Sequence, residues 1–294
     1  MSSSSSPSVT TDAETLKRNR ILSSKLYFDI PIFKLPLIYS PDYDISFLGI
    51  EKLHPFDSSK WGRICQFLSS EGFLDKNCIV EPLEASKEDL LVVHSESYLK
   101  SLQSSPNVSI IIEVPPVALF PNCLVQRKVL YPFRKQVGGT ILAAKLAKER
   151  GWAINVGGGF HHCSADEGGR VYILDMFNPG IYPRDYEARR FIDQKVEVVS
   201  GTTTNEYLKK LDEALEVAGH TFDPELVIYN AGTDILEGDP LGMLKISPDG
   251  IAARDEKTFR FARSRNIPIV MLTSGPITSE KVLALWSIRF HVFV

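Results

Sequence analysis

The fold of this chain is decided by residues 153–163, which read AINVGGGFHHC. The first four residues are a short apolar segment, which predicts a buried strand over 153–156. Three glycines follow it, so the backbone can approach a ligand closely or adopt positive φ there. Two adjacent histidines, His161 and His162, lie on the same predicted loop. The pattern indicates a strand that delivers polar side chains to the edge of a sheet.

Similar apolar segments recur along the chain and alternate with helix-like segments. We predict further strands over 171–174, 226–229 and 268–272, and, because of Pro31 and Pro36, extended chain or an edge strand over 30–39. Helical spacing predicts helices over 58–69, 85–102 (with a turn inside), 131–150, 205–217 and 249–265. This alternation is typical of an α/β fold in which helices cover both faces of a parallel sheet.

A second candidate segment is Asn230–Asp234, which follows the strand predicted over 226–229. Chemistry in parallel sheets lies beyond the carboxyl ends of the strands. A histidine pair directly after a glycine run favours proton transfer near neutral pH over a structural role. Asp234 is suited either to bind a metal or to cap the next turn. We expect the neighbouring Glu237 and Asp239 to lie in a solvated acidic loop.

Composition excludes several classes of protein. Hydrophobic residues make up 44% of the chain and charged residues 23%, as in ordinary globular proteins. No apolar run approaches the roughly 18 residues of a membrane span, and a net charge of −3 argues against direct nucleic-acid binding. The four cysteines form no CxxC pair, which argues against a disulfide framework or a thiolate zinc site. The Ser-rich start predicts a disordered tail over 1–24.

Four longer segments carry a resemblance to a known family. They read HPFDSSKW (54–61), LLVVHSESYLKSL (90–102), PFRKQVGGTILAAKLAKERGWAINVGGGFHHCSADEGG (132–169) and VIYNAGTDILEGDPLGMLKISPDGIAARDE (227–256). With them the sequence resembles the zinc-dependent histone deacetylases, most closely the class IV branch, over about residues 25–275. The remaining residues, 276–294, would form a divergent C-terminal tail.

The resemblance implies a fold, an activity and a cellular setting. The fold would be a three-layer, arginase/deacetylase-like parallel sheet flanked by helices. The activity would be zinc-dependent hydrolysis of acetyl-lysine in acetylated proteins or histone tails. This implies a role in chromatin regulation in the nucleus and/or cytoplasm. Regulatory protein partners fit this picture, and we expect no direct nucleic-acid or membrane partner.

Site residues follow from the same resemblance. His161 and His162 match the tandem catalytic histidines, one of which acts as general base while the other protonates or stabilises. Asp234 matches one of three zinc ligands. Gly159 and Phe160 would line the substrate pocket, although Phe160 could equally pack under the loop.

The sequence departs from the family pattern after Gly169. Family members continue there with a helix and a strand that ends in Asp-x-Asp-x-His, which supplies the other two zinc ligands. This chain passes directly from Gly169 to Arg170 and contains no Asp-x-His motif. The length of this connection also indicates that an element is missing. A crossover between parallel strands needs a dozen or more residues and usually a helix, whereas residues 157–170 are few and glycine-rich. We therefore expect a sheet that lacks one strand–helix element or is rewired here.

A second departure lies near the C-terminus. The family carries a Gly-Gly-Tyr motif whose tyrosine donates a hydrogen bond to the oxyanion, but no tyrosine follows Tyr229 here. A splice isoform or altered gene model would explain both departures. Two functions stay open: an active deacetylase, and a deacetylase-like chain that acts through partners or has no independent function. The departures favour the second. An arginase-like binuclear manganese site would need an Asp and His cluster that the sequence lacks.

Overall fold

The structure is a computed structural model of the 294-residue chain, and it describes residues 7–54, 57–159, 170–182, 184–239 and 241–275. The strands are β1 (Leu37–Ile38), β2 (Trp152–Asn155), β3 (Leu174–Phe177), β4 (Gln194–Glu197), β5 (Val227–Asn230) and β6 (Ile269–Leu272). The α-helices are α1 (Pro7–Ser23), α2 (Lys60–Ser70), α3 (Lys87–Leu90), α4 (Glu96–Ser101), α5 (Ser105–Ile111), α6 (Asn122–Val125), α7 (Tyr131–Arg150), α8 (Thr204–Thr221) and α9 (Pro248–Ser264). Short 3₁₀ turns and a π-helical segment, Gln126–Leu130, connect several of them.

Among the described residues, the paired strands are all parallel and form two separate sheets. The larger sheet has the strand order β1-β2-β6-β5, in which Ile154 lies opposite Met271 and Tyr229 lies opposite the same residue on the other side. The smaller sheet pairs β3 with β4. The most C-terminal strand, β6, therefore lies between β2 and β5 and holds the larger sheet together.

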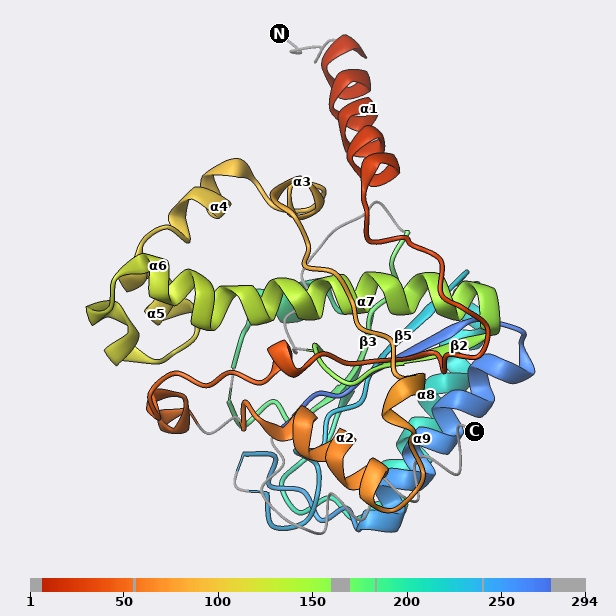
Figure 1. Ribbon diagram of the computed structural model, residues 1–294. Coiled ribbons are helices and arrows are strands. Elements are labelled where there is room, and N and C mark those ends of the chain that lie inside the picture. The colour runs from red at the N-terminus through yellow and green to blue at the C-terminus, as the bar shows by residue number, and fades with distance from the viewer. Residues whose placement is uncertain (1–6, 55–56, 160–169, 183, 240, 276–294) are drawn as a thin grey trace, which may run out of the picture.

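Helices cover both faces of the larger sheet (Figure 1). The long helix α7 lies on one face, and α2, α8 and α9 lie on the other. Successive side chains of β6 point to opposite faces of the sheet, which fits this arrangement. Val270 packs in the cluster that contains Leu142 and Leu146 of α7. Met271 packs in the cluster on the other face, which contains Trp61 of α2. This is the three-layer α/β architecture that the sequence predicts.

Local sequence signals set the bounds of the long helices. Helix α7 begins with Pro132 in its first turn and ends at Gly151, whose φ of 84° only glycine adopts without strain. Helix α8 begins with a capping box between Thr203 and Glu206, and Ser247 caps α9. Within the described part of the chain, the helices fall short of the length and apolar character that a membrane crossing needs.

The strand predicted over 171–174 needs correction. Strand β3 begins only at Leu174, and it belongs to the smaller sheet rather than to the sheet of β2, β5 and β6. In the described part of the chain, the next strand of the larger sheet after β2 is β5. The short connection after β2 therefore joins two sheets, which agrees with the predicted rewiring at this point.

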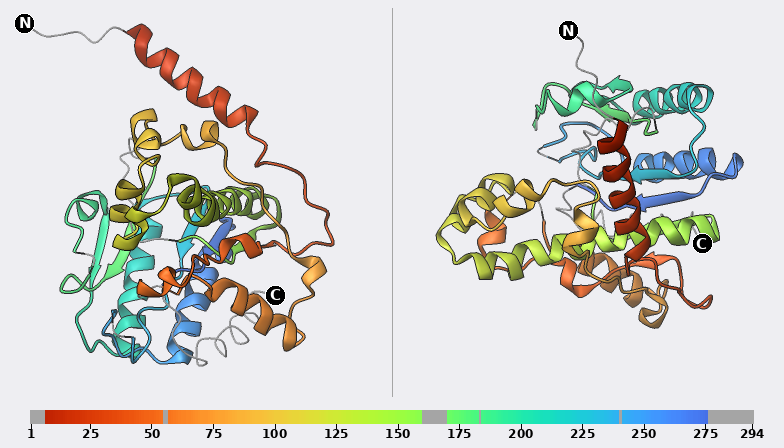
Figure 2. Two further views of the ribbon diagram at one scale, coloured as in Figure 1. Left: turned by 60° about the vertical axis from the view of Figure 1, so that its left-hand side comes forward. Right: turned by 90° about the horizontal axis from the view of Figure 1, so that it is seen from above.

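The N-terminal segment also differs from the prediction. Residues 7–23 of the predicted disordered tail form α1, which projects from the body of the protein (Figure 2). Good helix formers between Ala13 and Arg18 favour this conformation. Arg20 joins the helix to α3, because its Nε donates to Glu88 Oε2 at 2.9 Å.

The two sheets should differ in local stability. An isolated two-stranded sheet is marginal, whereas β6 is buried and paired on both edges. We expect the amides of β3 and β4 to exchange with solvent at least about tenfold faster than those of β6. Native-state hydrogen exchange measures this difference, with β2 as a second internal strand. Equal protection of both sheets would contradict the division of the fold into two sheets.

Candidate functional site

The carboxyl ends of β2, β5 and β6 meet at one edge of the larger sheet. A Cβ atom built on Gly159 would lie 2.5 Å from Asn230 Oδ1 and 3.1 Å from Ser274 Cβ, so this position admits only glycine. The φ of Gly159 is 76°, which also favours glycine. The glycine run after β2 and the segment after β5 thus lie together, as the sequence predicts, as far as Gly159.

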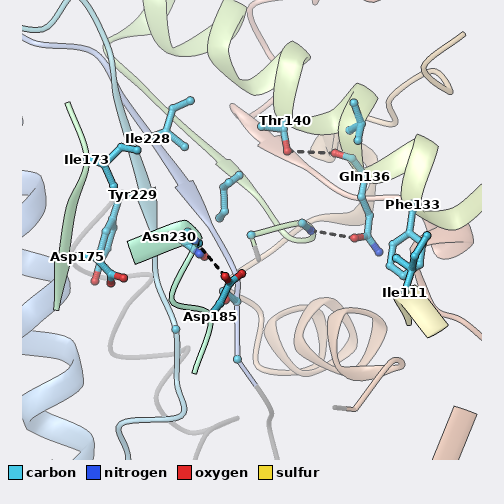
Figure 3. Close-up of a pocket in the computed structure, with 18 of the residues that line it drawn as sticks. Ile111, Phe133, Gln136, Thr140, Ile173, Asp175, Asp185, Ile228, Tyr229 and Asn230 are labelled. Atoms are coloured by element: carbon cyan, nitrogen blue, oxygen red, sulfur yellow. Dashed lines mark hydrogen bonds between the residues drawn. The ribbon is translucent and has the colours of Figure 1, made fainter. Parts of the chain in front are cut away.

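A buried polar network holds the glycine run in place. Tyr43 Oη donates to Asn155 Oδ1 at 3.0 Å, and Asn155 Nδ2 donates to the backbone oxygen of Gln136 at 3.2 Å. The Gln136 side chain in turn accepts from Gly158 N–H at 3.2 Å (Figure 3). Asn155 was not singled out in the sequence, although a polar residue in an otherwise apolar strand is the signal that marks it.

Helix α2 fixes the loop after β6. Trp61 Nε1 donates to Thr273 O at 3.2 Å, and the buried Lys60 donates its Nζ to Gly275 O. A Cβ atom on Gly275 would lie 2.6 Å from Thr233 N, so the loops after β5 and β6 are in close contact. These contacts place the backbone around Asp234.

An ion pair beneath the same edge supports the loop after β5. Arg254 and Asp255 of α9 have side chains that are 5% and 0% exposed, and Arg254 Nε donates to Asp255 Oδ1 at 2.9 Å. Arg254 also donates to Gly232 O, and Tyr229 Oη donates to Asp255. The pair therefore anchors the turn that presents Asp234, and the sequence analysis predicted only the helix that carries it.

Asp234 lies among other carboxylates. The pKa of Asp175 is raised by burial and then by the charge of Asp234, while Arg189 opposes the shift. The pKa of Asp239 is also raised, mainly by burial. Asp239 is 8% exposed and accepts from the N–H groups of the turn that follows it, so the predicted solvated acidic loop is wrong for Asp239, although Glu237 is exposed.

The donor groups do not complete a zinc site. Among the described residues, no three His, Cys, Asp or Glu side chains come together in a way that would hold a metal ion, whereas a catalytic zinc takes three protein ligands. Asp234 is the predicted ligand that the structure describes. His161, His162 and Phe160 lie outside the described residues. The described donors therefore do not fit the zinc that the resemblance implies.

A cavity of about 2680 Å³ opens beside this edge. Its lining includes Gly159 and Asp234 from the candidate site, and it continues between β5 and β3 past Tyr229 and Asp175 (Figure 3). Typical ligand pockets measure about 300–1,000 Å³. The cavity is therefore several times larger than a small-molecule site requires.

Removing one partner of the Arg254–Asp255 pair should be costly. The substitution Asp255→Ala leaves a buried guanidinium without its carboxylate, which typically costs about 3–5 kcal/mol. We expect a loss of that order in the free energy of unfolding, measured by urea denaturation. The matched control is Glu256→Ala on the same helix, whose exposed pair with Arg260 should contribute at most about 0.5 kcal/mol. Similar effects of the two substitutions would contradict the anchoring role.

The raised pKa of Asp175 predicts a pH-dependent effect. Because the pKa of Asp175 in the folded protein lies above its ordinary value of 3.8, the ionised side chain opposes folding at pH 7. We expect Asp175→Asn to raise the free energy of unfolding at pH 7. The gain should vanish as the pH falls below 3.8, because the Asp175 carboxyl is then protonated in both the folded and the unfolded chain. The exposed Asp223 gives the control substitution Asp223→Asn. Urea denaturation between pH 3 and pH 8 measures this difference. A gain in the free energy of unfolding that stayed constant over this range would contradict the prediction.

The comparisons with known proteins agree on one family. The sequence profile of the histone deacetylase domain matches residues 54–169 and 166–292. "Histone deacetylase 2" of Arabidopsis thaliana is 66% identical over 327 residues, covering 95% of this chain and 84% of that protein. "Histone deacetylase 8" of Xenopus tropicalis is 23% identical and covers 75% of this chain and 74% of its own length.

Solved structures support the same fold. The "HDA15 HD domain" superposes with a TM-score of 0.66 at 15% identity and covers 88% of both chains. The histone deacetylase homologue from Aquifex aeolicus superposes with a TM-score of 0.64 at 18% identity and covers 87% of this chain and 83% of its own. With this three-layer fold, the profile match and the Arabidopsis relative, the chain belongs to the histone deacetylase family.

Proposed function

We propose that this chain carries the deacetylase fold without a complete catalytic site and does not hydrolyse acetyl-lysine by itself. The observation that carries the proposal is the short connection between β2 and β3, across which the sheet divides in two. The family places two zinc ligands on an element that would lie in this connection. Asp234 then stays as the single carboxylate of the family's ligand set.

Two comparisons support a missing segment at this connection. The family profile matches in two parts that meet at residues 166–169. The alignment with the Arabidopsis relative extends over 327 residues, whereas 95% of 294 residues is about 279, which leaves about 48 positions without a counterpart in this chain. A deletion of that length would remove a strand and a helix together, since a βαβ unit takes about 30 residues or more.

The finer assignments follow from resemblance. We propose that the chain derives from the class IV branch, to which the segments around His161 and Asp234 are most similar. A splice isoform or altered gene model would account for the internal gap and for the C-terminal residues 276–294. Acetylated proteins or histone tails are the proposed substrates of the intact enzyme, and regulatory proteins the proposed partners. The nucleus and/or cytoplasm is the proposed location.

An active deacetylase is the second candidate function. The 66% identity to the Arabidopsis histone deacetylase and the retained His161, His162 and Asp234 favour it. It would need the described edge to bind zinc with a ligand set different from the family's. The two candidates differ in zinc content and in turnover, so one experiment separates them.

The test compares four purified proteins on an acetyl-lysine peptide with added zinc. They are the chain, its His161→Ala, His162→Ala double variant, the chain with the Arabidopsis segment inserted between Gly169 and Arg170, and the double variant of that restored chain. We expect the chain to retain no zinc above background and to show no turnover above its double variant. Loss of a single oxyanion donor already costs about a hundred- to a thousandfold in rate.

The restored chain and its double variant serve as controls. If the insertion restores zinc binding, the assay is able to detect a repaired site. Turnover in the original chain that disappears in its His161→Ala, His162→Ala variant would overturn the proposal and favour the active enzyme.

A further inference from the structure

Two sheet edges border the large cavity. Strand β5 ends the larger sheet, β3 ends the smaller one, and residues of both strands line the cavity. Figure 3 shows Ile173 and Ile228 toward one end, and Asp175 and Asn230 toward the other, so the two strands run in the same direction. A parallel strand laid between them would therefore face one strand of each sheet.

The hydrogen-bond pattern identifies the backbone groups that point into the cavity. Val227 N–H donates to Pro268 O and Ala231 N–H donates to Leu272 O, so alternate residues of this segment bond toward β6. The backbone of Ile228 therefore points away from β6 and toward the cavity. An incoming strand would find a donor and an acceptor there.

Strand β3 also has two residues whose backbone groups point toward the cavity. Ile173 O accepts from Gln194 N–H and Phe177 O accepts from Val198 N–H, so these residues bond toward β4. Leu174 and Met176 alternate with them, and their backbone groups point toward the cavity. Among the described residues, no strand pairs with this edge of β3 or with the facing edge of β5.

Apolar side chains line the space above and below these edges. Helix α7 contributes Val137 and Ile141, and α8 contributes Leu211 and Leu215. The Ile228 side chain is 56% exposed although it lies on a strand of the larger sheet. A strand in this position would be apolar on both faces, as buried parallel strands are, and a following helix would cover Ile228.

We propose that the cavity binds an extended polypeptide segment as a parallel strand between β5 and β3, followed by a helix over Ile228 and Val137. The occupant we assign is the part of the Arabidopsis relative that has no counterpart in this chain, supplied by a second polypeptide; we place it between residues 169 and 170 from the two-part profile match and interpret it as a strand–helix unit. This rests on the missing segment in the proposed function. The roughly 48 positions without a counterpart are long enough for such a unit.

The experiment titrates the full 294-residue chain with a synthetic peptide of that Arabidopsis segment. Isothermal titration calorimetry measures binding, and hydrogen exchange locates it. We expect saturable one-to-one binding. We also expect at least about tenfold slower exchange at the amides of Ile228, Leu174 and Met176, because each gains a hydrogen-bond acceptor.

A proline substitution tests strand pairing directly. Ile228→Pro removes the N–H that points into the cavity and leaves the donors toward β6 intact, and proline is tolerated on such an edge. We expect it to weaken peptide binding at least about tenfold. The matched variant Ile228→Ala keeps the N–H and should bind the peptide within about threefold of the original chain. A proline in the strand portion of the peptide provides the same test without altering the chain.

Three results would overturn the proposal. The first is no binding by the folded chain, and the second is binding that neither proline weakens. The third is a free chain in which the Ile228 and Met176 amides are already protected, because another part of the chain or a second copy would then fill the cavity. Sedimentation velocity identifies a second copy. Binding and exchange are measured without an acetylated substrate, so their failure is distinguishable from unexpected deacetylase activity.

Discussion

Every N–H and C=O group on a buried strand needs a partner, and this requirement governs the structure. Neighbouring strands of a parallel sheet are joined by long crossover connections. A connection that is too short for a crossover cannot lead to a neighbouring strand of the same sheet. The connection after β2 is such a place. The sheet divides there, and a cavity separates β5 from β3. Among the described residues, this is also the edge at which no three metal-binding side chains come together.

The part of the site that persists depends on supports away from the break. Strand β6 lies between β2 and β5, and the loops at their carboxyl ends are anchored from both helical layers. Gln136 of α7 holds the glycine run, while Trp61 of α2 and Arg254 of α9 hold the other two loops. Asp234 is therefore presented by a well-supported backbone even though the described residues do not supply the ligands that a zinc ion requires.

Local signals in the sequence predict much of this fold. The helix over 131–150 and the strands near β2, β5 and β6 are confirmed, because periodicity and glycine stops act over a few residues. Strand β4 carries no strong apolar signal, and its pairing with β3 depends on residues distant in sequence. The sequence pattern likewise does not predict the burial of Arg254 and Asp255, since charged side chains on a helix are usually exposed to solvent. His161 and His162 lie outside the described residues, so their role stays a prediction.

The central position of β6 has a consequence for biosynthesis. About 110 residues separate β2 from β6, the strand that completes its pairing. At translation rates of about 5–20 residues per second, the nascent chain exposes that apolar edge for roughly 6–22 seconds. During this interval β2 can pair only with β1 and is open to chaperones or to neighbouring nascent chains. We therefore expect the yield of folded protein to depend on elongation speed over residues 156–268.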